Sequence, residues 1–325
     1  MKDFEVIDCH IHLSPTLEQE VGYYPYPGRR DRDRWAYPEM ANAYMDKAGI
    51  SKMGFMILIP RQFRAPLFEK GKLMALPEAR RRQEMKKVSD EIVALQKKYN
   101  EWGCGVGRKN PRLIPFITIT DDFGDEKAIL KELELRVKQG TKGVKLHPGI
   151  YSFRPDNEVL FPMYEKCQEL GLPVLSDTAP YPHSGQIQVY PLHYQVPKPH
   201  IEYGEPVKFE PVLKTFPRLK LIMAHLGSAW WDERVELAQK YSNVYFDTSQ
   251  GFLASDRIPI NAHRGLGEED TPRIIRKIGI KRVLFGTDWS ALAAMPQLEQ
   301  ILRMNLTDRE KQAILADNTK RVYNL

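Results

Sequence analysis

Two histidines near the start of the chain, His10 and His12, have the residue type and spacing of a metal-binding pair. They lie in the run Val-Ile-Asp-Cys-His-Ile-His-Leu, which is typical of a strand. Alternate side chains of a strand point to one face, so we expect the two imidazoles together, with Cys9 and Ile11 pointing away. Two converging neutral imidazoles supply half of a zinc-type site. Taken alone, the pair is equally compatible with two exposed histidines at a strand end.

Further ionisable residues follow other apolar runs of the sequence. They are Lys145, His147, Asp177, His225, Asp247 and Asp288. The alternation in Gly143 to His147 predicts that Lys145 and His147 share one face. The interior of a barrel is normally filled by branched apolar side chains, so ionisable groups gathered at one end indicate a ligand.

The elements that would position these residues alternate between short apolar runs and helical periodicity, which is typical of βα units. The expected strands are Phe4 to Cys9, Met53 to Ile59, Leu113 to Ile119, Gly143 to Leu146, Pro173 to Ser176, Leu219 to Ala224, Val244 to Asp247 and Val283 to Gly286. Eight strands predict a single α/β domain over residues 1–325, a (β/α)8 TIM barrel. Long segments 14–37 and 178–205 would be rim insertions on its catalytic face, and 296–325 would form C-terminal helices.

Composition restricts the class of protein further. The 325 residues carry a formal net charge of +6, but the densest basic run, Arg80 to Arg82, lies among acidic residues on a helical pattern. This favours a solvated helix face over a nucleic-acid surface. No apolar run of about 18 residues and no signal peptide are visible, so no membrane partner is expected. Three widely spaced cysteines agree with a reducing, cytoplasmic compartment.

Four motifs, in this order along the chain, carry a family resemblance: Asp8-Cys9-His10-Ile11-His12, Gly143-Val144-Lys145-Leu146-His147-Pro148, Ala224-His225-Leu226-Gly227 and Phe285-Gly286-Thr287-Asp288-Trp289. The chain resembles the amidohydrolase superfamily, particularly its amidohydrolase-related branch. That branch includes aminocarboxymuconate semialdehyde decarboxylase and resorcylate-type decarboxylases. The resemblance covers nearly the whole chain.

The resemblance implies that His10, His12 and Asp288 bind one divalent metal ion, and that His225 lies beside it as an acid, a base or a substrate-orienting group. The family usually has a histidine ligand after strand 5, where this chain has Asp177. A carboxylate there could bind the metal, shifting the preference from zinc, the first expectation, toward manganese. Alternatively, Asp177 orients a water molecule or His225 from outside the coordination sphere.

Substrate contacts are expected from Lys145, His147, Arg61 and Trp289. Lys145 could anchor a substrate carboxylate, pair with Asp177 or Asp247, or be a carboxylated lysine bridging two metals, as in some superfamily members. His147 could contact substrate or pack. A guanidinium at Arg61 suits a carboxylate. Trp289 could line the binding site of a planar substrate or pack in the core.

The leading functional hypothesis is a metal-dependent hydrolase acting on an amide, ester or lactone of a small-molecule substrate. Asp288 would accept the proton of a metal-activated water and His225 would stabilise the oxyanion. The alternative is a non-oxidative decarboxylase of an aromatic or enoic acid that uses the same metal. A third reading is an inactive binding barrel. A homodimer is possible.

Overall fold

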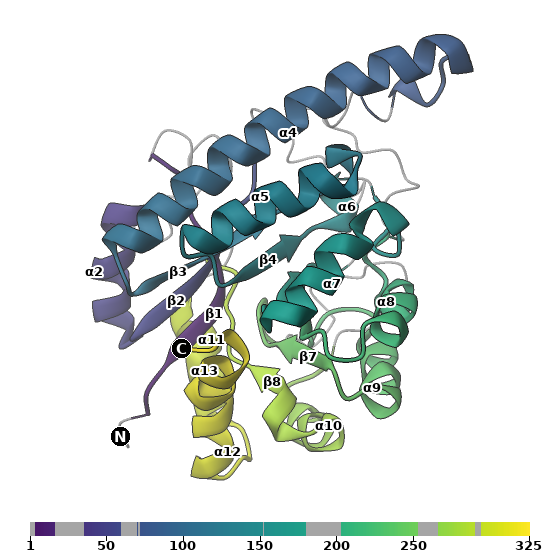
Figure 1. Cartoon of the computed structure of the whole chain (residues 1–325). Helices are drawn as coiled ribbons and strands as arrows, with labels where there is room; N and C mark the ends of the chain where they lie inside the picture. The colour runs from purple at the N-terminus through teal and green to yellow at the C-terminus, as the bar shows by residue number, and fades with distance from the viewer. Residues whose placement is uncertain are drawn as a thin grey trace.

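Eight parallel strands form the centre of the molecule in a computed structural model that describes residues 4–16, 36–59, 70, 72–151, 153–179, 203–252, 266–289 and 294–325 (Figure 1). The strands are β1 (Ile7–His12), β2 (Lys52–Met56), β3 (Leu113–Thr118), β4 (Gly143–Leu146), β5 (Val174–Ser176), β6 (Leu221–Met223), β7 (Val244–Asp247) and β8 (Val283–Leu284). Each strand pairs with the next in chain order. The segment after β8 returns to β1, where Cys9 N donates to Phe285 O at 2.8 Å. The predicted α/β TIM barrel is confirmed.

Helices surround the barrel and follow the strands in sequence. They are α2 (Pro38–Ala48), α4 (Glu78–Lys109), α5 (Glu126–Lys138), α6 (Pro148–Tyr151), α7 (Phe161–Leu170), α8 (Glu210–Thr215), α9 (Trp231–Lys240), α10 (Thr271–Ile278), α11 (Ala294–Arg303), α12 (Asp308–Gln312) and α13 (Asn318–Tyr323). Short 3-10 turns are η3 (Asp121–Phe123), η4 (Glu158–Leu160), η8 (Pro206–Phe209) and η10 (Ile280–Arg282), and η11 (Ala313–Asp317) is π-helical. Figure 1 shows α4 extending past the barrel at the upper right.

Strand β1 does not alternate as its sequence predicts. Its pairing with β2 shifts register between Asp8 and Ile11, which is the mark of a bulge. Cys9 therefore packs in the small cluster that fills the barrel, whereas Ile11 joins the larger core beneath the helices. The expectation that Cys9 and Ile11 both point away from the barrel is wrong, because a bulge adds one residue to the period of two.

The C-terminal helix closes the end of the barrel where the strands begin. Val322 and Tyr323 of α13 belong to the interior cluster, together with Phe116 and Leu175 from the strands. The Tyr323 hydroxyl donates to Cys9 O at 2.7 Å. The chain terminus is therefore packed directly beneath the strand that carries His10.

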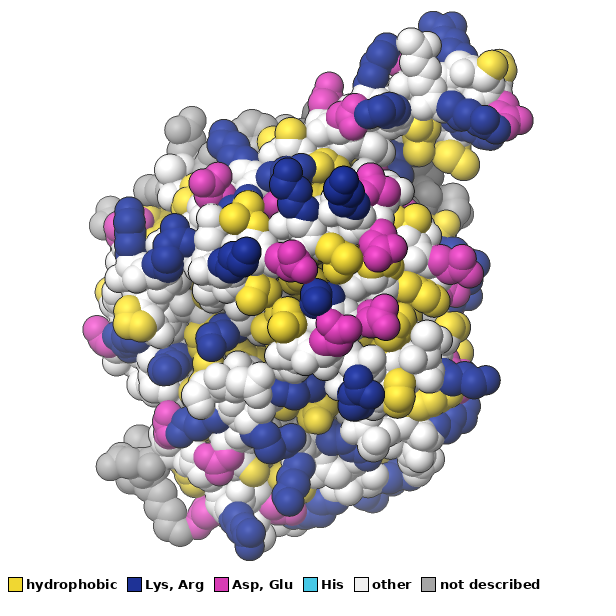
Figure 2. All heavy atoms as spheres, in the orientation of Figure 1, with side chains coloured by type: hydrophobic (Ala, Val, Ile, Leu, Met, Phe, Trp, Pro, Cys, Tyr) yellow, Lys and Arg dark blue, Asp and Glu magenta, His cyan; other side chains and the backbone are white. Residues whose placement is uncertain are grey.

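The outer surface mixes charges of both signs. Over α4, α5 and α7, Figure 2 shows Lys and Arg interspersed with Asp and Glu. On α4, Arg82 pairs with Glu78, Lys87 with Glu84 and Lys86 with Asp90. This agrees with the predicted solvated helix face. Among the described residues, no helix is long and apolar enough to cross a membrane.

Candidate metal centre and active site

Three side chains converge where β1 and β8 end. His10 and His12 come from β1, and Asp288 follows β8 in a left-handed conformation with φ of 59°. Asp288 Oδ1 lies 3.0 Å from His12 Nε2 and 3.9 Å from His10 Nε2. One potential ligand atom from each lies within 4.8 Å of the others. Ligands bonded to one ion at about 2.1 Å stand roughly 3 to 4 Å apart, so this donor set fits a divalent metal.

The second nitrogen of each histidine supports the fit. His10 Nδ1 lies 2.9 Å from Asp247 Oδ2, and His12 Nδ1 lies 3.2 Å from Met56 O. Both partners are hydrogen-bond acceptors, so a neutral ring with its proton on Nδ1 would satisfy them and keep the Nε2 lone pair for a metal. Burial and the neighbouring Lys145 lower the pKa of His10 to about 4. The His10 ring is therefore neutral at pH 7, as a ligand must be.

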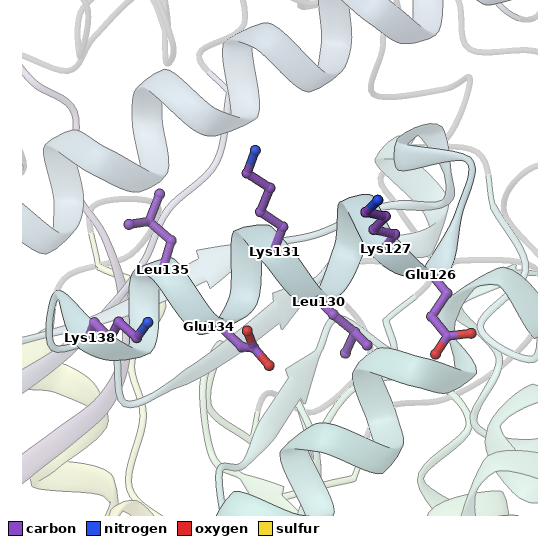
Figure 3. Close-up of a pocket in the computed structure, with 7 residues that line it drawn as sticks. All are labelled: Glu126, Lys127, Leu130, Lys131, Glu134, Leu135 and Lys138. Atoms are coloured by element: carbon purple, nitrogen blue, oxygen red, sulfur yellow. The ribbon is translucent and has the colours of Figure 1, made fainter.

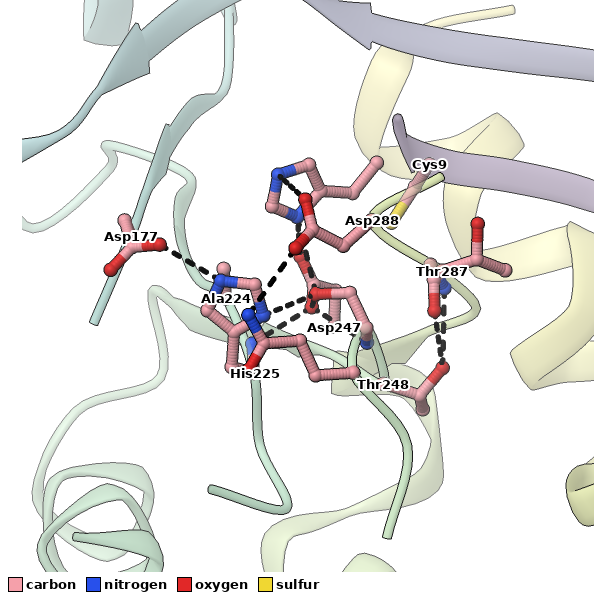
Figure 4. A network of polar contacts seen from close by, with 12 residues as sticks. Cys9, Asp177, Ala224, His225, Asp247, Thr248, Thr287 and Asp288 are labelled. Atoms are coloured by element: carbon pink, nitrogen blue, oxygen red, sulfur yellow. Dashed lines mark hydrogen bonds and ion pairs between the residues drawn. The ribbon is translucent and has the colours of Figure 1, made fainter. Parts of the chain in front are cut away.

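Asp247, at the end of β7, is the hub of the polar network in Figure 4. Its Oδ1 accepts hydrogen bonds from His225 N at 2.9 Å, from Ser249 N at 3.0 Å and from the Ser249 hydroxyl. One potential ligand atom from each of His10, His225 and Asp247 also lies within 4.8 Å of the others. Because donors already surround Asp247, we interpret this second group as a hydrogen-bonded support for the first.

His225 is bonded through both of its ring nitrogens. Nδ1 lies 2.8 Å from Ser249 Oγ, and Nε2 lies 2.9 Å from Asp177 Oδ2. Ser249 Oγ accepts from His225 when its own proton goes to Asp247. The Asp177 carboxylate is an acceptor in either case. With the Ser249 proton on Asp247, both ring nitrogens of His225 donate and the ring is an imidazolium.

The electrostatics of this pair agree with its hydrogen bonds. Burial alone would lower the pKa of His225, but the adjacent Asp177 carboxylate outweighs burial and raises it. Burial would raise the pKa of Asp177, but His147 and His225 hold it well below its usual range. His147 Nε2 lies 3.4 Å from the same carboxylate oxygen. Asp177 thus lies between two imidazoles.

The structure places Asp177 with His225 and His147, whereas His10, His12 and Asp288 form a group that could hold a metal ion. Asp177 is absent from the ligand groups found among the described residues. This placement follows the second sequence-based alternative, in which Asp177 orients His225.

Lys145 reaches the metal group from β4. It is fully buried, and its Nζ lies 3.1 Å from His10 Nε2. Burial lowers its pKa, while the carboxylates of Asp177 and Asp288 act in the opposite direction. Among the described residues, no carboxylate forms an ion pair with Lys145. The structure therefore brings Lys145 and His147 to the site, as their shared face predicts.

The Trp289 side chain, a predicted substrate contact, packs in the core. The Trp289 ring is 1% exposed and stacks on Tyr44 of α2, with ring centroids 4.3 Å apart. Its backbone reaches the site, since its carbonyl accepts from His12 N at 2.6 Å. Arg61 and most of the two rim insertions lie outside the described residues. The packing alternative describes the position of Trp289 better.

Sequence reasoning missed two residues that the structure brings to the site. Ser249 connects His225 with Asp247, and Gln250 Nε2 donates to Asp288 Oδ2 at 3.2 Å. Gln250 and His225 both have φ of 66°, and with Asp288 they make three left-handed non-glycine residues in one small region. Such strain gathers at functional sites because surrounding contacts must enforce it. The polar run Thr248-Ser249-Gln250 directly after β7 was the available signal.

A hollow on the outer surface is a separate feature. It runs along α5 and is lined by residues that include Lys127, Leu130, Lys131, Leu135 and Lys138 (Figure 3). These residues lie on the solvent side of a helix, away from the strand ends. The site is therefore the strand-end constellation, where buried ionisable groups converge.

The fold and this constellation define a class of protein: an α/β barrel with a metal-ligand group at the carboxyl ends of its strands. An amidohydrolase family profile matches residues 7–325, and the chain belongs to that family. The resemblance found in the sequence is thereby confirmed. A search of curated proteins finds no match.

Solved structures share the fold at low sequence identity. A 5-carboxyvanillate decarboxylase from Novosphingobium aromaticivorans with bound manganese is 15% identical, with a TM-score of 0.68 over 100% of this chain and 98% of the other. A dihydroxybenzoic acid decarboxylase from Polaromonas, also with manganese, is 18% identical, with a TM-score of 0.66 over 99% and 97%. A 2,6-dihydroxybenzoate decarboxylase from Rhizobium is 17% identical, with a TM-score of 0.65 over 99% of each chain.

These comparisons correct the leading functional hypothesis. The three solved structures named above are decarboxylases of aromatic acids. The choice of a hydrolase acting on an amide, ester or lactone is therefore wrong, and the alternative is the better reading. The physical reason is that hydrolases and decarboxylases of one superfamily share the metal ligands, so those motifs alone do not distinguish the two reactions.

Proposed function

We propose that this protein is a non-oxidative, metal-dependent decarboxylase of a small aromatic or enoic acid. The observation that carries the proposal is the 2.9 Å contact between His225 Nε2 and the Asp177 carboxylate, beside the candidate metal ligands. That carboxylate raises the pKa of His225 and so favours its protonated form. We propose that His225 is a protonated acid and that the reacting carbon of the substrate lies beside it. Decarboxylation needs such an acid, because the carbon that loses carbon dioxide must gain a proton.

The reaction is balanced by one proton. His225 donates a proton to the carboxyl-bearing carbon, the carbon–carbon bond breaks, and its electron pair returns to the conjugated system as carbon dioxide leaves. His225 then regains a proton from water. Asp177 stabilises the imidazolium before transfer and keeps the ring oriented during it.

Lys145 and His147 are the groups positioned to bind the substrate carboxylate. Lys145 is buried beside His10, and His147 contacts Asp177 from β4. A buried ammonium attracts a carboxylate strongly because little water screens the pair. Binding in this place would set the carboxyl-bearing carbon next to His225.

We propose one divalent ion per chain, held by His10, His12 and Asp288. When bound, it would hold and neutralise oxygen atoms of the substrate as a Lewis acid. Zinc and manganese both accept two imidazoles and a carboxylate. Reconstitution of metal-free protein with each ion, followed by metal analysis and turnover assays, identifies the ion. Two equivalents per chain would contradict the single-ion proposal.

Carbon dioxide release is the direct test of the function. We expect protein loaded with manganese or zinc to release labelled carbon dioxide from carboxyl-labelled hydroxybenzoates or muconate-type acids. In heavy water, the product should carry one deuterium at the carbon that bore the carboxyl group. A fully loaded protein that releases no carbon dioxide from either class of acid would refute the proposal.

His225→Asn is the matched variant for this test. Asparagine tolerates the left-handed conformation of residue 225 better than most residues, but it cannot supply the proton. We expect about a 10²- to 10⁴-fold loss of kcat, the range for removal of a general acid. Bound metal should persist, because His225 is not among the three ligands. Unchanged kcat would show that another group supplies the proton.

A further inference from the structure

Arg234, on α9, is a fully buried arginine with an unusual set of partners. Its Nη2 donates to Thr178 O at 2.6 Å and to Thr178 Oγ1 at 3.0 Å. Its Nη1 donates to Ala229 O at 2.7 Å, and Nη2 also reaches Ser228 Oγ at 3.2 Å. All of these partners are carbonyls or hydroxyls. Among the described residues, no carboxylate forms an ion pair with it.

A buried charge without a carboxylate partner is costly, so its retention points to a function. Burial lowers the pKa of Arg234 to about 10, which still leaves the guanidinium charged at pH 7. The planar fork of arginine can bind several acceptors in fixed directions at once. Its hydrogen bonds therefore join chain segments at a defined distance.

The two segments that Arg234 joins are those that carry Asp177 and His225. Thr178 directly follows Asp177, and its hydroxyl also donates to Ala224 O at 2.7 Å. Ala224 directly precedes His225, and Ser228 follows three residues later. The Arg234 guanidinium thus lies behind the 2.9 Å contact between the Asp177 carboxylate and His225.

The segment that carries His225 also needs support. His225 has φ of 66° and Trp230, just before α9, has φ of 65°. Both are left-handed conformations that non-glycine residues adopt only when surrounding contacts enforce them. Arg234 bonds Ala229 O and Ser228 Oγ between these two residues. It therefore helps to hold the strained segment in place.

We propose that Arg234 is a positioning residue that keeps Asp177 and His225 in contact by joining the segments after β5 and β6. The catalytic consequence rests on the proposed function, in which His225 supplies the proton. The positioning itself is a property of the fold and is measurable without turnover. Loss of the forked guanidinium should let the two segments separate and should weaken the hydrogen bond between His225 and Asp177.

The test uses two variants of the metal-loaded protein. Arg234→Lys keeps the charge but removes the fork, and Thr178→Val removes the hydroxyl that Arg234 and Ala224 share. We expect kcat to fall about 10- to 100-fold in each, the range for a residue that orients a metal or catalytic group, while KM changes less than about threefold. The metal content should stay at the wild-type level, because the three ligands lie on β1 and after β8.

Histidine side-chain nitrogen NMR supplies the second readout. In wild-type protein we expect His225 to give an imidazolium signal, assigned by its absence in His225→Asn, and this signal should shift toward the neutral form in both variants. If Arg234→Lys does not fold, Thr178→Val carries the test. Thr178→Ser keeps the hydroxyl and should restore both kcat and the signal.

Arg136→Lys is the matched control. Arg136 is a similarly buried arginine on α5, but it pairs with Glu132 at 2.7 Å on the same helix. Its replacement should reduce stability without moving kcat or the His225 signal. Wild-type kcat and an unchanged His225 signal in both Arg234→Lys and Thr178→Val would overturn the inference. Absence of carbon dioxide release by wild-type protein would instead refute the proposed function, while the NMR comparison would still test positioning.

Discussion

Asp247 joins the two halves of the site through its two carboxylate oxygens. Oδ2 bonds the ring of the metal ligand His10, and Oδ1 bonds the backbone of His225 and the Ser249 side chain. It is fully buried, and His10 and His225 outweigh the effect of burial to hold its pKa below its usual range. The orientation of the metal ligand and that of the acid therefore depend on one side chain.

Asp247→Asn tests this dependence. The amide has one acceptor oxygen, so it cannot serve the His10 ring and the Oδ1 donors together. We expect metal affinity to fall about 10- to 100-fold, as for other partners that orient ligands, with kcat also reduced. Competition with a chelator measures the affinity. Asp156→Asn is the control, since Asp156 pairs with Arg154 at the surface. Equal affinity in wild type and Asp247→Asn would contradict the assignment.

For single residues, the sequence predicts which side chains could take part in chemistry better than it predicts which side chains are in contact. His10, His12, Asp288 and His225 could be found because each follows an apolar run, and strand ends of a barrel meet at one rim. For Asp177 the sequence left two positions open, as a metal ligand or beside His225, since which side chains of neighbouring loops meet depends on backbone conformations such as the left-handed His225. Ser249 was missed for the same reason.

Helix α4 shows how packing overrides a local signal. Gly103, Gly105 and Gly107 lie close together near the end of α4, and glycine disfavours helices. The helix continues to Lys109. A Cβ at residue 107 would lie 2.7 Å from Pro115 Cδ and 3.2 Å from Leu113 O. The glycine therefore lets α4 pack against β3, which the sequence of the helix alone does not reveal.

Two alanine substitutions in α4 test this explanation. Gly107→Ala should destabilise the protein by about 1–3 kcal/mol, since the rigid Pro115 ring and the β3 backbone leave no room. Gly105→Ala should stabilise it by roughly 0.5–1 kcal/mol, because a Cβ there would meet only the Arg108 side chain at 3.8 Å. Urea unfolding measures both. Equal effects at the two positions would show that helix propensity alone decides.

The start of α12 offers a prediction about pH. Glu310 forms a capping box with Thr307 and pairs with Arg276 of α10 at 2.8 Å. The Arg276 hydrogen bond in particular lowers the pKa of Glu310 from 4.5 to about 2. A depressed carboxyl pKa stabilises the fold above about pH 4.5, and this contribution disappears as the pH falls toward 2.

Glu310→Gln should therefore lower the melting temperature at pH 7 by about 1–2 °C, the size expected of a mostly exposed pair and cap. The difference from wild type should shrink as the pH falls from 4.5 to 2, because wild type then loses the same charge. Melting curves at pH 7, 4 and 2.5 measure it. A difference that stays constant across this range would show that the Glu310 charge is not responsible.

Across the whole molecule, part of the basic excess has a structural use at the end of the barrel where the strands begin. Arg112, just before β3, donates to Ile50 O after α2, and Arg282, just before β8, donates to Ala238 O in the last turn of α9. Lys220, before β6, donates to Val322 O in α13. Helices end at this rim with unpaired carbonyls and a negative dipole, so cations there are favourable.

The same end of the barrel holds the contact that links the chain terminus to the site. Tyr323 is buried at this end of the barrel, with its ring centroid 4.6 Å from that of Phe116. Its hydroxyl donates to the carbonyl of Cys9, the residue before His10. Tyr323→Phe keeps the ring and should cost about 0.5–1.5 kcal/mol, the net value of one hydrogen bond. Tyr323→Ala should destabilise the protein by about 3–5 kcal/mol, because it leaves a cavity where the buried ring packs.

Comparison of the two variants separates the packing of the Tyr323 ring from the effect of its hydroxyl on the orientation of His10. If the Tyr323 hydroxyl also fixes the β1 bulge, Tyr323→Phe should weaken metal affinity more than its small loss of stability explains, since the bulge determines where His10 points. Urea unfolding of metal-free protein gives the stability, and chelator competition gives the affinity. Wild-type affinity in Tyr323→Phe would show that the C-terminal helix serves only to close the barrel.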